Sequence, residues 1–588
     1  PVCPKAGAPP RMRLRNRKID AICPKKVSQR RSDGHLGEAE AVNQTFLKSS
    51  YLTTSCLAAL LAFSPALSQA ETLRFAASGD AVTLDPYVVE EVFTSGFLGN
   101  IYEGLIRRAP DLSIQPGLAE SWELLSPTHW RFHLRKGVTF HDGSPFTADD
   151  VVYSAERVRS GASDYKNRLA ADTEVVAVDD FTVDFITKSP NPILHFTWAN
   201  WYMMSRSWSE ANNIGAPDKG SNVESYATLH ENGTGPFRVV SREPGIKTVL
   251  AANENWWGIG SVPGNVTAVE FTPVPNASTR VAALLSDQVD VVFPIPVQDI
   301  DRIEASPNAH ILAGPEVRTM YLTMNQWRDT LPGSAVEGVN PLKDQRVREA
   351  LYRAIDIEAI RDKIMRGQAS PTATMVAPGV NGYSDAFTRY AYDPAKAKAL
   401  LVEAGYPNGF SMSLECSNDM YVNDEAICLA VANMLAKIGV DAKANVQSRA
   451  KYIETITAPN MNFGMAMLGT TPASYDSHIA LYSLHMCPRV SPDRPVWAPD
   501  DLQKIVAGKS NFAGYCNPEV DRLAGEILVE TDETKRNALI AEAWTITTKD
   551  VAYIPLHQSW GAWAVRDGIE VARRADNVFD WRYVTISQ

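Results

Sequence analysis

The stretch from Trp130 to Tyr153 constrains the fold of this chain more than any other. Its first residues alternate between apolar and polar, as the residues of a half-buried strand do. Gly137 then turns the chain into a second short strand at Val138–Phe140, and a tight turn follows. Thr147 is placed to cap a helix, because its hydroxyl can accept a free backbone N–H. The stretch therefore predicts a hairpin that leads into a capped helix.

Other short segments accompany this stretch in a fixed order. NIYEGL at 100–105 and IQPGLAESW at 114–122 precede it. The segments that follow are GTGPF at 233–237, NENWW at 253–257, YLTMN at 321–325, DQRVREALYRAID at 344–356, YDPAKAKALLVEAGY at 392–406 and YIPLH at 553–557. Together they resemble the signature of the family 5 extracellular solute-binding proteins, the dipeptide-, oligopeptide- and nickel-binding receptors of ABC importers. The resemblance extends from about Glu71 to the C-terminus.

The resemblance implies an α/β fold of the two-lobed periplasmic-binding-protein type (type II, cluster C), with an extra small domain in the first lobe. Strands joined by helices agree with an α/β architecture. The two glycines of GTGPF are expected to adopt backbone conformations closed to other residues. The expected segments are the first lobe at 71–115, 233–320 and 556–588, the small domain at 116–232, and the third lobe at 321–555.

The first 70 residues are expected to lie outside the mature protein. Residues 1–41 are a basic extension without apolar periodicity, and 42–70 read as a cleaved signal peptide whose apolar core is too short to span a membrane. We expect translation to start near Val42, where an alternative initiation codon would read as Val. We expect the mature chain to begin near Glu71 and to be periplasmic.

Charge is distributed unevenly along the 588 residues. Residues 1–70 carry a net charge of +7, and the remainder, with 46 basic and 64 acidic residues, carries −18. Nucleic-acid binding needs basic patches, so an acidic body of this kind argues against that function. The acidic surface favours solubility instead.

Four cysteines remain after the expected cleavage site. An even number in an exported protein favours disulfides. Closeness in sequence favours the pairs Cys416–Cys428 and Cys487–Cys516. A zinc site is the competing interpretation, but the chain has no C-x-x-C pair with a nearby His.

Sequence motifs for catalysis are missing, so we expect no enzyme, no cofactor and no metal site. Gly508-Lys509-Ser510 imitates part of a P-loop, yet Gln503 stands where the first glycine is required. We find no G-x-S-x-G and no H-E-x-x-H motif. The resemblance implies that separate permease and ATPase subunits at the inner membrane move the solute and hydrolyse ATP.

The resemblance also indicates where a ligand would bind, since peptide-binding members use a segment shortly before the YEGL motif. Here that segment contains Glu91, Phe93 and Thr94. Glu91 could meet a cation, and Phe93 could offer an apolar wall. An ordinary solvated loop is the competing interpretation. Trp327, after YLTMN, is a further ligand candidate.

A second ligand segment is expected at Met465–Asp476, where Gly469, Thr470, Thr471 and Asp476 are the candidates. Peptide binders typically have Gly-Trp here, followed three residues after the Trp by an Asp that pairs with the peptide ammonium. This chain has Thr470 and Ala473 at those positions. Asp476 lies three residues further on and could substitute. A buried ammonium without a partner is unstable, so the departure weakens the case for ordinary peptides.

Three functions therefore compete. The first is a monomeric periplasmic receptor that captures a small peptide or peptide-like solute for an ABC importer. The second is a receptor for another solute, such as an opine, a glycoside, glutathione or a nickel chelate. The third, an exported hydrolase or chaperone, is disfavoured because no nucleophile constellation is evident.

Overall fold

The computed structural model describes residues 71–217, 225–334, 336–457, 460–491, 494–495 and 508–587, which belong to one unit of the chain, 69–588. The expected extension, start site and signal peptide lie outside the described residues. Within those ranges, no helix combines the length and apolarity needed to cross a bilayer.

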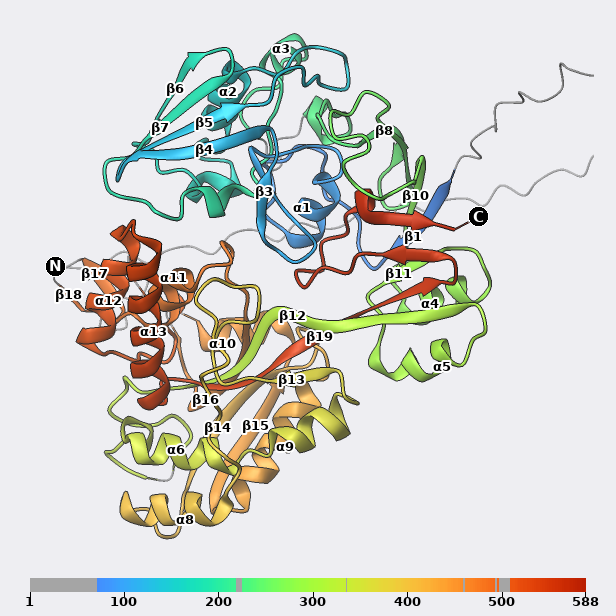
Figure 1. The fold of residues 1–588 in the computed structure, drawn as a ribbon. Helices are drawn as coiled ribbons and strands as arrows, with labels where there is room; N and C mark the ends of the chain where they lie inside the picture. Colours follow the sequence, from blue (N-terminus) through green and yellow to red (C-terminus); the bar gives the residue numbers. More distant parts are fainter. Residues whose placement is uncertain are drawn as a thin grey trace, which may run out of the picture. The chain divides into compact units, whose positions relative to one another are not determined.

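A mixed sheet of eleven strands runs through the molecule (Figure 1). Ten of its strands form one path, in the order β15 (Val440–Gln447), β14 (Phe410–Ser417), β16 (Met465–Thr470), β12 (Ala309–Met324), β19 (Ile554–Arg566), β11 (Val291–Phe293), β1 (Thr72–Ala77), β10 (Ala268–Pro273), β9 (Lys247–Ala252) and β8 (Phe237–Glu243). The eleventh, β13 (Ala369–Pro371), pairs with β19. Parallel and antiparallel pairs both occur, which confirms the α/β class.

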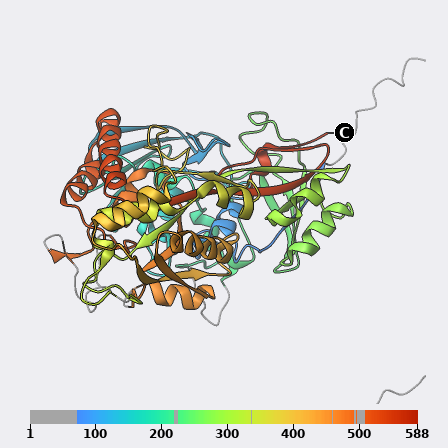
Figure 2. The same cartoon turned by 90° about the horizontal axis from the view of Figure 1, so that it is seen from below.

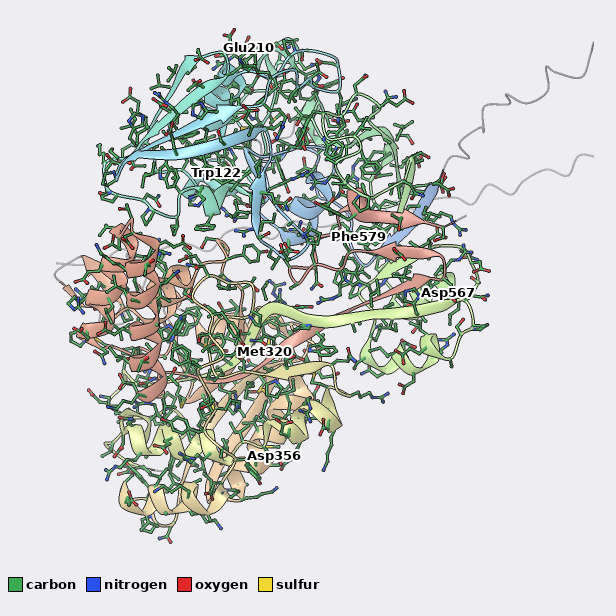
Figure 3. All side chains as sticks on the ribbon, in the orientation of Figure 1. Trp122, Glu210, Met320, Asp356, Asp567 and Phe579 are labelled. Carbon is green, nitrogen blue, oxygen red and sulfur yellow. A yellow bond between two sulfur atoms is a disulfide. The ribbon has the colours of Figure 1, made fainter. Side chains whose placement is uncertain are left out.

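Two long strands join the two halves of this sheet. β12 and β19 pair antiparallel from Ala309–Arg566 to Leu322–Ile554, with register shifts near Pro315 and Met320. Figures 1 and 2 show them side by side. Trp563 of β19 packs in the core beside β1, whereas Met320 of β12, labelled in Figure 3, packs in the core beside β14. Each crossing strand therefore serves two hydrophobic cores.

A separate four-stranded antiparallel sheet contains the Trp130 hairpin, in the order β4 (Ala119–Ser126), β5 (His129–Leu134), β7 (Thr182–Ile186) and β6 (Glu174–Asp179). The helix that follows, α2 (Ala148–Val158), begins after Thr147 as predicted. The Asp150 carboxylate accepts the Thr147 N–H at 2.9 Å, the reciprocal half of a capping box. The predicted strand at Val138–Phe140 is wrong: this segment forms one isolated bridge, Thr139–Pro145, within a tight loop.

The other helices cover the sheets and connect their strands. They are α1 (Val92–Leu98), α3 (Arg206–Ala211), α4 (Ala277–Leu285), α5 (Ile300–Glu304), α6 (Gln345–Ala354), α7 (Ile357–Ala359), α8 (Pro394–Glu403), α9 (Asp424–Ala436), α10 (Arg449–Ile456), α11 (Ser477–Ala480), α12 (Pro518–Val529) and α13 (Glu533–Lys549). Three two-stranded sheets complete the fold: β2 (Ile106–Arg108) with β3 (Ile114–Pro116), β17 (Arg489–Ser491) with β18 (Arg494–Pro495), and β20 (Ile569–Val571) with β21 (Val584–Ile586).

From the sequence we expect a helix over Thr94–Leu105 that ends in the YEGL motif. The observed helix is shorter, since α1 ends at Leu98. The backbone beyond it bonds to the returning GTGPF segment: the Gly235 N–H donates to the Ile101 carbonyl, and the Phe237 N–H to the Asn100 carbonyl. A Cβ on Gly233 would lie 2.0 Å from the Ile101 oxygen. Glycine is therefore required at position 233 because the backbone of Ile101 approaches it closely, and not because of an unusual dihedral angle.

Both predicted disulfides are present. Cys416, at the end of β14, pairs with Cys428 of α9 across 12 residues, and Cys487 pairs with Cys516 across 29. These pairs each join elements of the half of the molecule that contains β14–β16.

Candidate functional site

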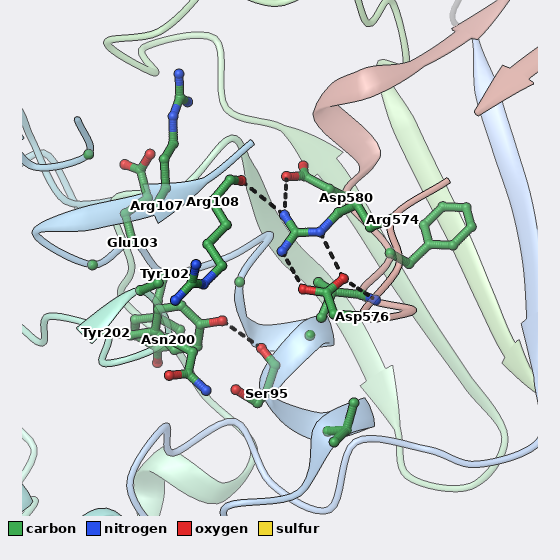
Figure 4. A pocket seen from close by; sticks show the side chains of 18 of the residues that line it. Ser95, Tyr102, Glu103, Arg107, Arg108, Asn200, Tyr202, Arg574, Asp576 and Asp580 are labelled. Atoms are coloured by element: carbon green, nitrogen blue, oxygen red, sulfur yellow. Dashed lines mark hydrogen bonds and ion pairs between the residues drawn. The ribbon is translucent and has the colours of Figure 1, made fainter. Parts of the chain in front are cut away.

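A cavity of about 120 Å³ lies where five stretches of the chain meet. Its wall is made by α1 with the turn after it, both arginines of β2, residues 196–202, the loop 473–475 and the C-terminal segment 574–582. We call it the main cavity because both predicted ligand segments reach it, although the pocket that Trp327 lines is larger, at about 850 Å³. Figure 4 shows Arg574 at the wall of the main cavity, hydrogen-bonded to Asp576 and ion-paired with Asp580.

One face of α1 lines the main cavity. Val92, Ser95 and Gly96 take part, as does Gly99 just after the helix. Their spacing of three and four residues places them on a single helix face. The first predicted ligand segment therefore does reach a cavity, through residues that neighbour the three we selected. The helical spacing was the signal that could have identified them.

Glu91, Phe93 and Thr94, the three residues selected from this segment, make contacts within the protein that stabilise its fold. Both carboxylate oxygens of Glu91 cap α1, accepting the Phe93 and Thr94 N–H groups at 2.8 Å each. The Phe93 ring packs 5.8 Å from Phe271, and the Thr94 hydroxyl accepts the Val82 N–H at 3.2 Å. None of the three is among the residues that line the main cavity.

The second predicted segment reaches the cavity through Ala473 and Tyr475. Gly469 and Thr470 belong to β16 and pair with β12. The Thr471 hydroxyl accepts a hydrogen bond from Arg318 at 3.5 Å. Gly469, Thr470 and Thr471 thus lie beside the cavity-lining loop without lining the cavity themselves.

Asp476 does not act as a free carboxylate. It is fully buried, and Arg536 donates to both of its oxygens at 2.7 Å. It also caps α11 by accepting the His478 N–H at 2.8 Å. Burial opposes ionisation of Asp476, but the hydrogen bonds and charge of Arg536 hold its pKa below the usual value. This corrects our expectation of a substitute ammonium anchor, since the carboxylate already neutralises Arg536.

Trp327 lies elsewhere. It lines a second, polar pocket with Arg328 and Tyr515, and the Arg328 guanidinium is 5.1 Å from its ring centre. The structure therefore does not bring Trp327 together with the other predicted ligand residues.

Tyr475 links the loop 473–475 to the opposite wall. Its ring centre lies 4.1 Å from the Arg108 guanidinium, and its hydroxyl donates to Asp576 at 3.2 Å. Arg108 also donates to the Ser474 carbonyl at 2.9 Å. Burial lowers the pKa of Arg108 to about 10. Arg108, Tyr475 and Asp576 were all missed from the sequence, because the segments that carry them are far apart along the chain.

Glu103 explains why three of the sequence motifs occur together. The Glu103 carboxylate accepts the indole N–H groups of Trp256 at 3.1 Å and Trp257 at 2.8 Å, and the Thr234 hydroxyl at 3.1 Å. Burial is the largest influence on Glu103 and raises its pKa. NIYEGL, NENWW and GTGPF therefore converge on one buried carboxylate beside the main cavity.

The chemistry of this wall suits binding. Among the described residues that line the main cavity, no His, Cys or Lys accompanies the Ser95 hydroxyl as a general base. Across the described residues, no group of three or more His, Cys, Asp or Glu side chains is arranged to hold a metal ion. Arginines, tyrosines and an apolar helix face are groups that orient a bound solute.

Comparison with known proteins identifies the family. Residues 113–491 match the family described as bacterial extracellular solute-binding proteins, family 5. The chain belongs to this family. Its members are substrate-binding proteins of ABC importers rather than enzymes, and they act outside the cytoplasmic membrane together with permeases.

Relatives cover most of the chain. It is 27% identical over 526 residues to the glutathione-binding protein GsiB of Salmonella choleraesuis, covering 87% of this chain and 93% of the relative. It is 27% identical over 511 residues to a dipeptide-binding protein of Escherichia coli, covering 81% and 87%. The solved structure of HbpA2 from Haemophilus parasuis superposes with a TM-score of 0.73 at 22% identity, covering 88% of this family 5 chain and all of HbpA2. The last comparison establishes the shared fold.

Proposed function

We propose that this chain is the periplasmic substrate-binding component of an ABC importer and that it captures a small peptide or peptide-like solute in the main cavity. The observation that carries the proposal is the cavity itself, in which the helix after Glu91 and the loop before Asp476 come together. These are the two segments in which the family resemblance predicts ligand contacts. The glutathione- and dipeptide-binding relatives support a solute of this size and type.

Delivery to the membrane would depend on movement about the crossing strands. β12 and β19 connect the sheet half that carries α1 to the half that carries the loop 473–475. A solute held between them stabilises the closed arrangement, as in other periplasmic binding proteins. Export through the signal peptide at 42–70, cleavage near Glu71 and a monomeric state complete the proposal.

A receptor for another solute, such as an opine, a glycoside, glutathione or a nickel chelate, is the second candidate. One observation favours it. Ala473 lines the cavity at the position where peptide binders have an aspartate, and the nearby Asp476 is occupied by Arg536.

Native mass spectrometry of the mature protein, purified from its own periplasm without refolding, tests both candidates. We expect a bound mass of a small peptide or peptide-like solute. Adding that solute to the emptied protein should raise Tm, because a ligand at 100 times its Kd stabilises the folded state by about 2.7 kcal/mol. Turnover of the solute without a rise in Tm would contradict a binding role. A mature N-terminus far from Glu71 would contradict the proposed export signal.

A further inference from the structure

The charges in the wall of the main cavity do not balance. The wall contains four arginines, at positions 107, 108, 574 and 582, and three acids, at positions 103, 576 and 580. All three acids are already engaged. The remaining sections of the wall are uncharged, so the distribution of these seven charges determines which solutes the cavity can accept.

Two of the arginines, Arg574 and Arg582, form ion pairs with the three acidic side chains. Arg574 bonds to Asp576 at 2.6 Å and lies 3.8 Å from Asp580. Arg582 bonds to Asp580 at 2.6 Å and lies 3.9 Å from Glu103. Although burial opposes ionisation of Asp580, these arginines hold its pKa below the usual value. None of these carboxylates is left to receive a ligand's ammonium group.

Arg108 has no carboxylate partner, but its donors are occupied. They reach the carbonyls of Leu112 at 3.0 Å, Phe196 at 3.1 Å and Ser474 at 2.9 Å. Arg108 therefore holds three segments of the wall together, and its charge remains without a neutralising partner.

The Arg107 side chain has neither a carboxylate partner nor a hydrogen bond among the described residues, although its backbone pairs with Gln115 in the β2–β3 sheet. Its Nε and Nη1 atoms are buried without a hydrogen-bond partner. Its guanidinium lies 5.6 Å from the ring centre of Trp257, whose own N–H is held by Glu103. Burial, followed by the charge of Arg582, lowers the pKa of Arg107. Figure 4 shows Arg107 and Arg108 leaving β2 in different directions, with the Arg107 guanidinium away from the ion pairs of Arg574.

Arg107 is half-buried. A half-buried guanidinium with two buried and unpaired nitrogens favours a carboxylate partner, which it would bind through charge-assisted hydrogen bonds. A cationic solute would instead add to an unbalanced positive charge.

We propose that the main cavity selects solutes that carry a carboxylate, that Arg107 binds this carboxylate, and that the cavity does not hold a ligand ammonium through a carboxylate. This inference rests on the proposed function. It narrows the peptide-like class to molecules that place a carboxylate in the cavity and pair no ammonium there, such as acidic peptides or peptides whose amino end lies outside the cavity.

Chemical modification of the solute pool provides the test. The dialysable fraction of a peptone medium, combined with solute released from the purified protein, is divided into three portions: untreated, acetylated at amines and methyl-esterified at carboxyl groups. Each portion is added to the emptied protein, and bound masses and Tm are recorded. We expect the untreated and acetylated portions to bind and raise Tm, and the esterified portion to do neither.

The outcomes separate the inference from the proposed function. Failure of the untreated portion to bind contradicts the proposed function itself. Binding of the untreated and esterified portions alike overturns the carboxylate requirement. Loss of binding on acetylation also overturns the inference, because an ammonium would then be needed.

Substitution of Arg107 tests its proposed role in carboxylate binding, and Arg135 provides a matched control. Arg135 lies 3.9 Å from the same Trp257 ring but does not line the cavity. We expect Arg107→Gln to weaken binding of the untreated solute by about tenfold or more, the usual effect of losing a charge-assisted bond. The Tm of this variant without solute should not fall, since the Arg107 side chain has no hydrogen bond to lose. Arg135→Gln should keep the affinity. Equal affinities in the two variants, or a fall in the Tm of solute-free Arg107→Gln, would overturn the role of Arg107.

Discussion

Charged side chains in the interior of this protein have different roles, depending on whether they are paired, and the sequence alone does not reveal which of them are paired. Glu103 organises three motifs by accepting hydrogen bonds from two indoles and a hydroxyl. Asp476 neutralises Arg536. Arg107 has no such partner. A buried charge that is already paired maintains the fold, whereas an unpaired one is available to a solute.

The buried ion pair between Asp476 and Arg536 should contribute measurably to the free energy of unfolding. Asp476→Asn removes the negative charge and leaves Arg536 buried without a counterion, so we expect the free energy of unfolding to fall by about 3–5 kcal/mol. The measurement is chemical unfolding of the solute-free protein. Glu519→Gln, which breaks a solvent-exposed pair with Arg522, is the control and should leave the unfolding midpoint unchanged. An Asp476→Asn variant with native stability and lost solute binding would restore the ligand role that we have withdrawn.

Both ligand segments predicted from the sequence reach the main cavity, but the residues selected within them do not line it, and the reason is physical. The family resemblance, which rests on short motifs local in sequence, located the segment after Glu91 and the loop before Asp476. Pairing is not local: Arg536 lies 60 residues from Asp476, and Arg108 lies 366 residues from the Ser474 carbonyl that it binds. Nothing in the local sequence distinguishes a paired carboxylate from a free one.

Among the elements, α1 shows how tertiary contacts override local propensity. The helix expected from the sequence continues to Leu105. The backbone after Leu98 instead forms hydrogen bonds with the GTGPF segment, more than 130 residues away. Helix and strand ends elsewhere, such as those of α6, α8 and β14, agree closely with their caps and glycines. Local signals therefore succeed where the chain has no competing partner.

The two disulfides should differ in reactivity because their surroundings differ. Cys416 and Cys428 are both fully buried, whereas Cys516 is exposed and gives a reductant access to its bond with Cys487. We expect mild reduction of the folded protein to open Cys487–Cys516 first, and opening either bond to lower the free energy of unfolding by about 3 kcal/mol. Alkylation of the released cysteines, followed by peptide mass mapping, shows which disulfide is reduced first. Equal labelling of all four cysteines at early times would contradict the prediction.

For the whole molecule, the crossing strands explain why the fold was easier to predict than the ligand. β12 and β19 take part in both hydrophobic cores, so the two-lobed architecture follows from apolar patterns that extend over many residues. The solute site that we propose is the main cavity alone, where a few side chains from five segments determine the charge. Fold is therefore encoded redundantly along the chain, whereas specificity depends on a small number of long-range juxtapositions.

Acid should destabilise the whole molecule in a defined range. Burial lowers the pKa of His478, His485 and His557 from 6.5 to about 4, so the folded state keeps them neutral while the unfolded chain binds protons. Stability should be complete above pH 6.5 and should fall as the pH drops towards 4, by about 1–3 kcal/mol for each histidine. Tm measured across this range checks the prediction.

Two substitutions isolate the cause of this acid response. His557 of β19 is fully buried, and neither of its ring nitrogens has a hydrogen-bond partner among the described residues, so His557→Leu should retain more of its Tm on acidification. His310, which is partly exposed and lies 3.1 Å from Asp567, is the control, and His310→Gln should reproduce the native pH profile. If His557→Leu lost as much Tm between pH 6.5 and 4 as the unaltered protein, the decline would have to originate in the carboxylates instead, because His557 would then have no measurable share in it.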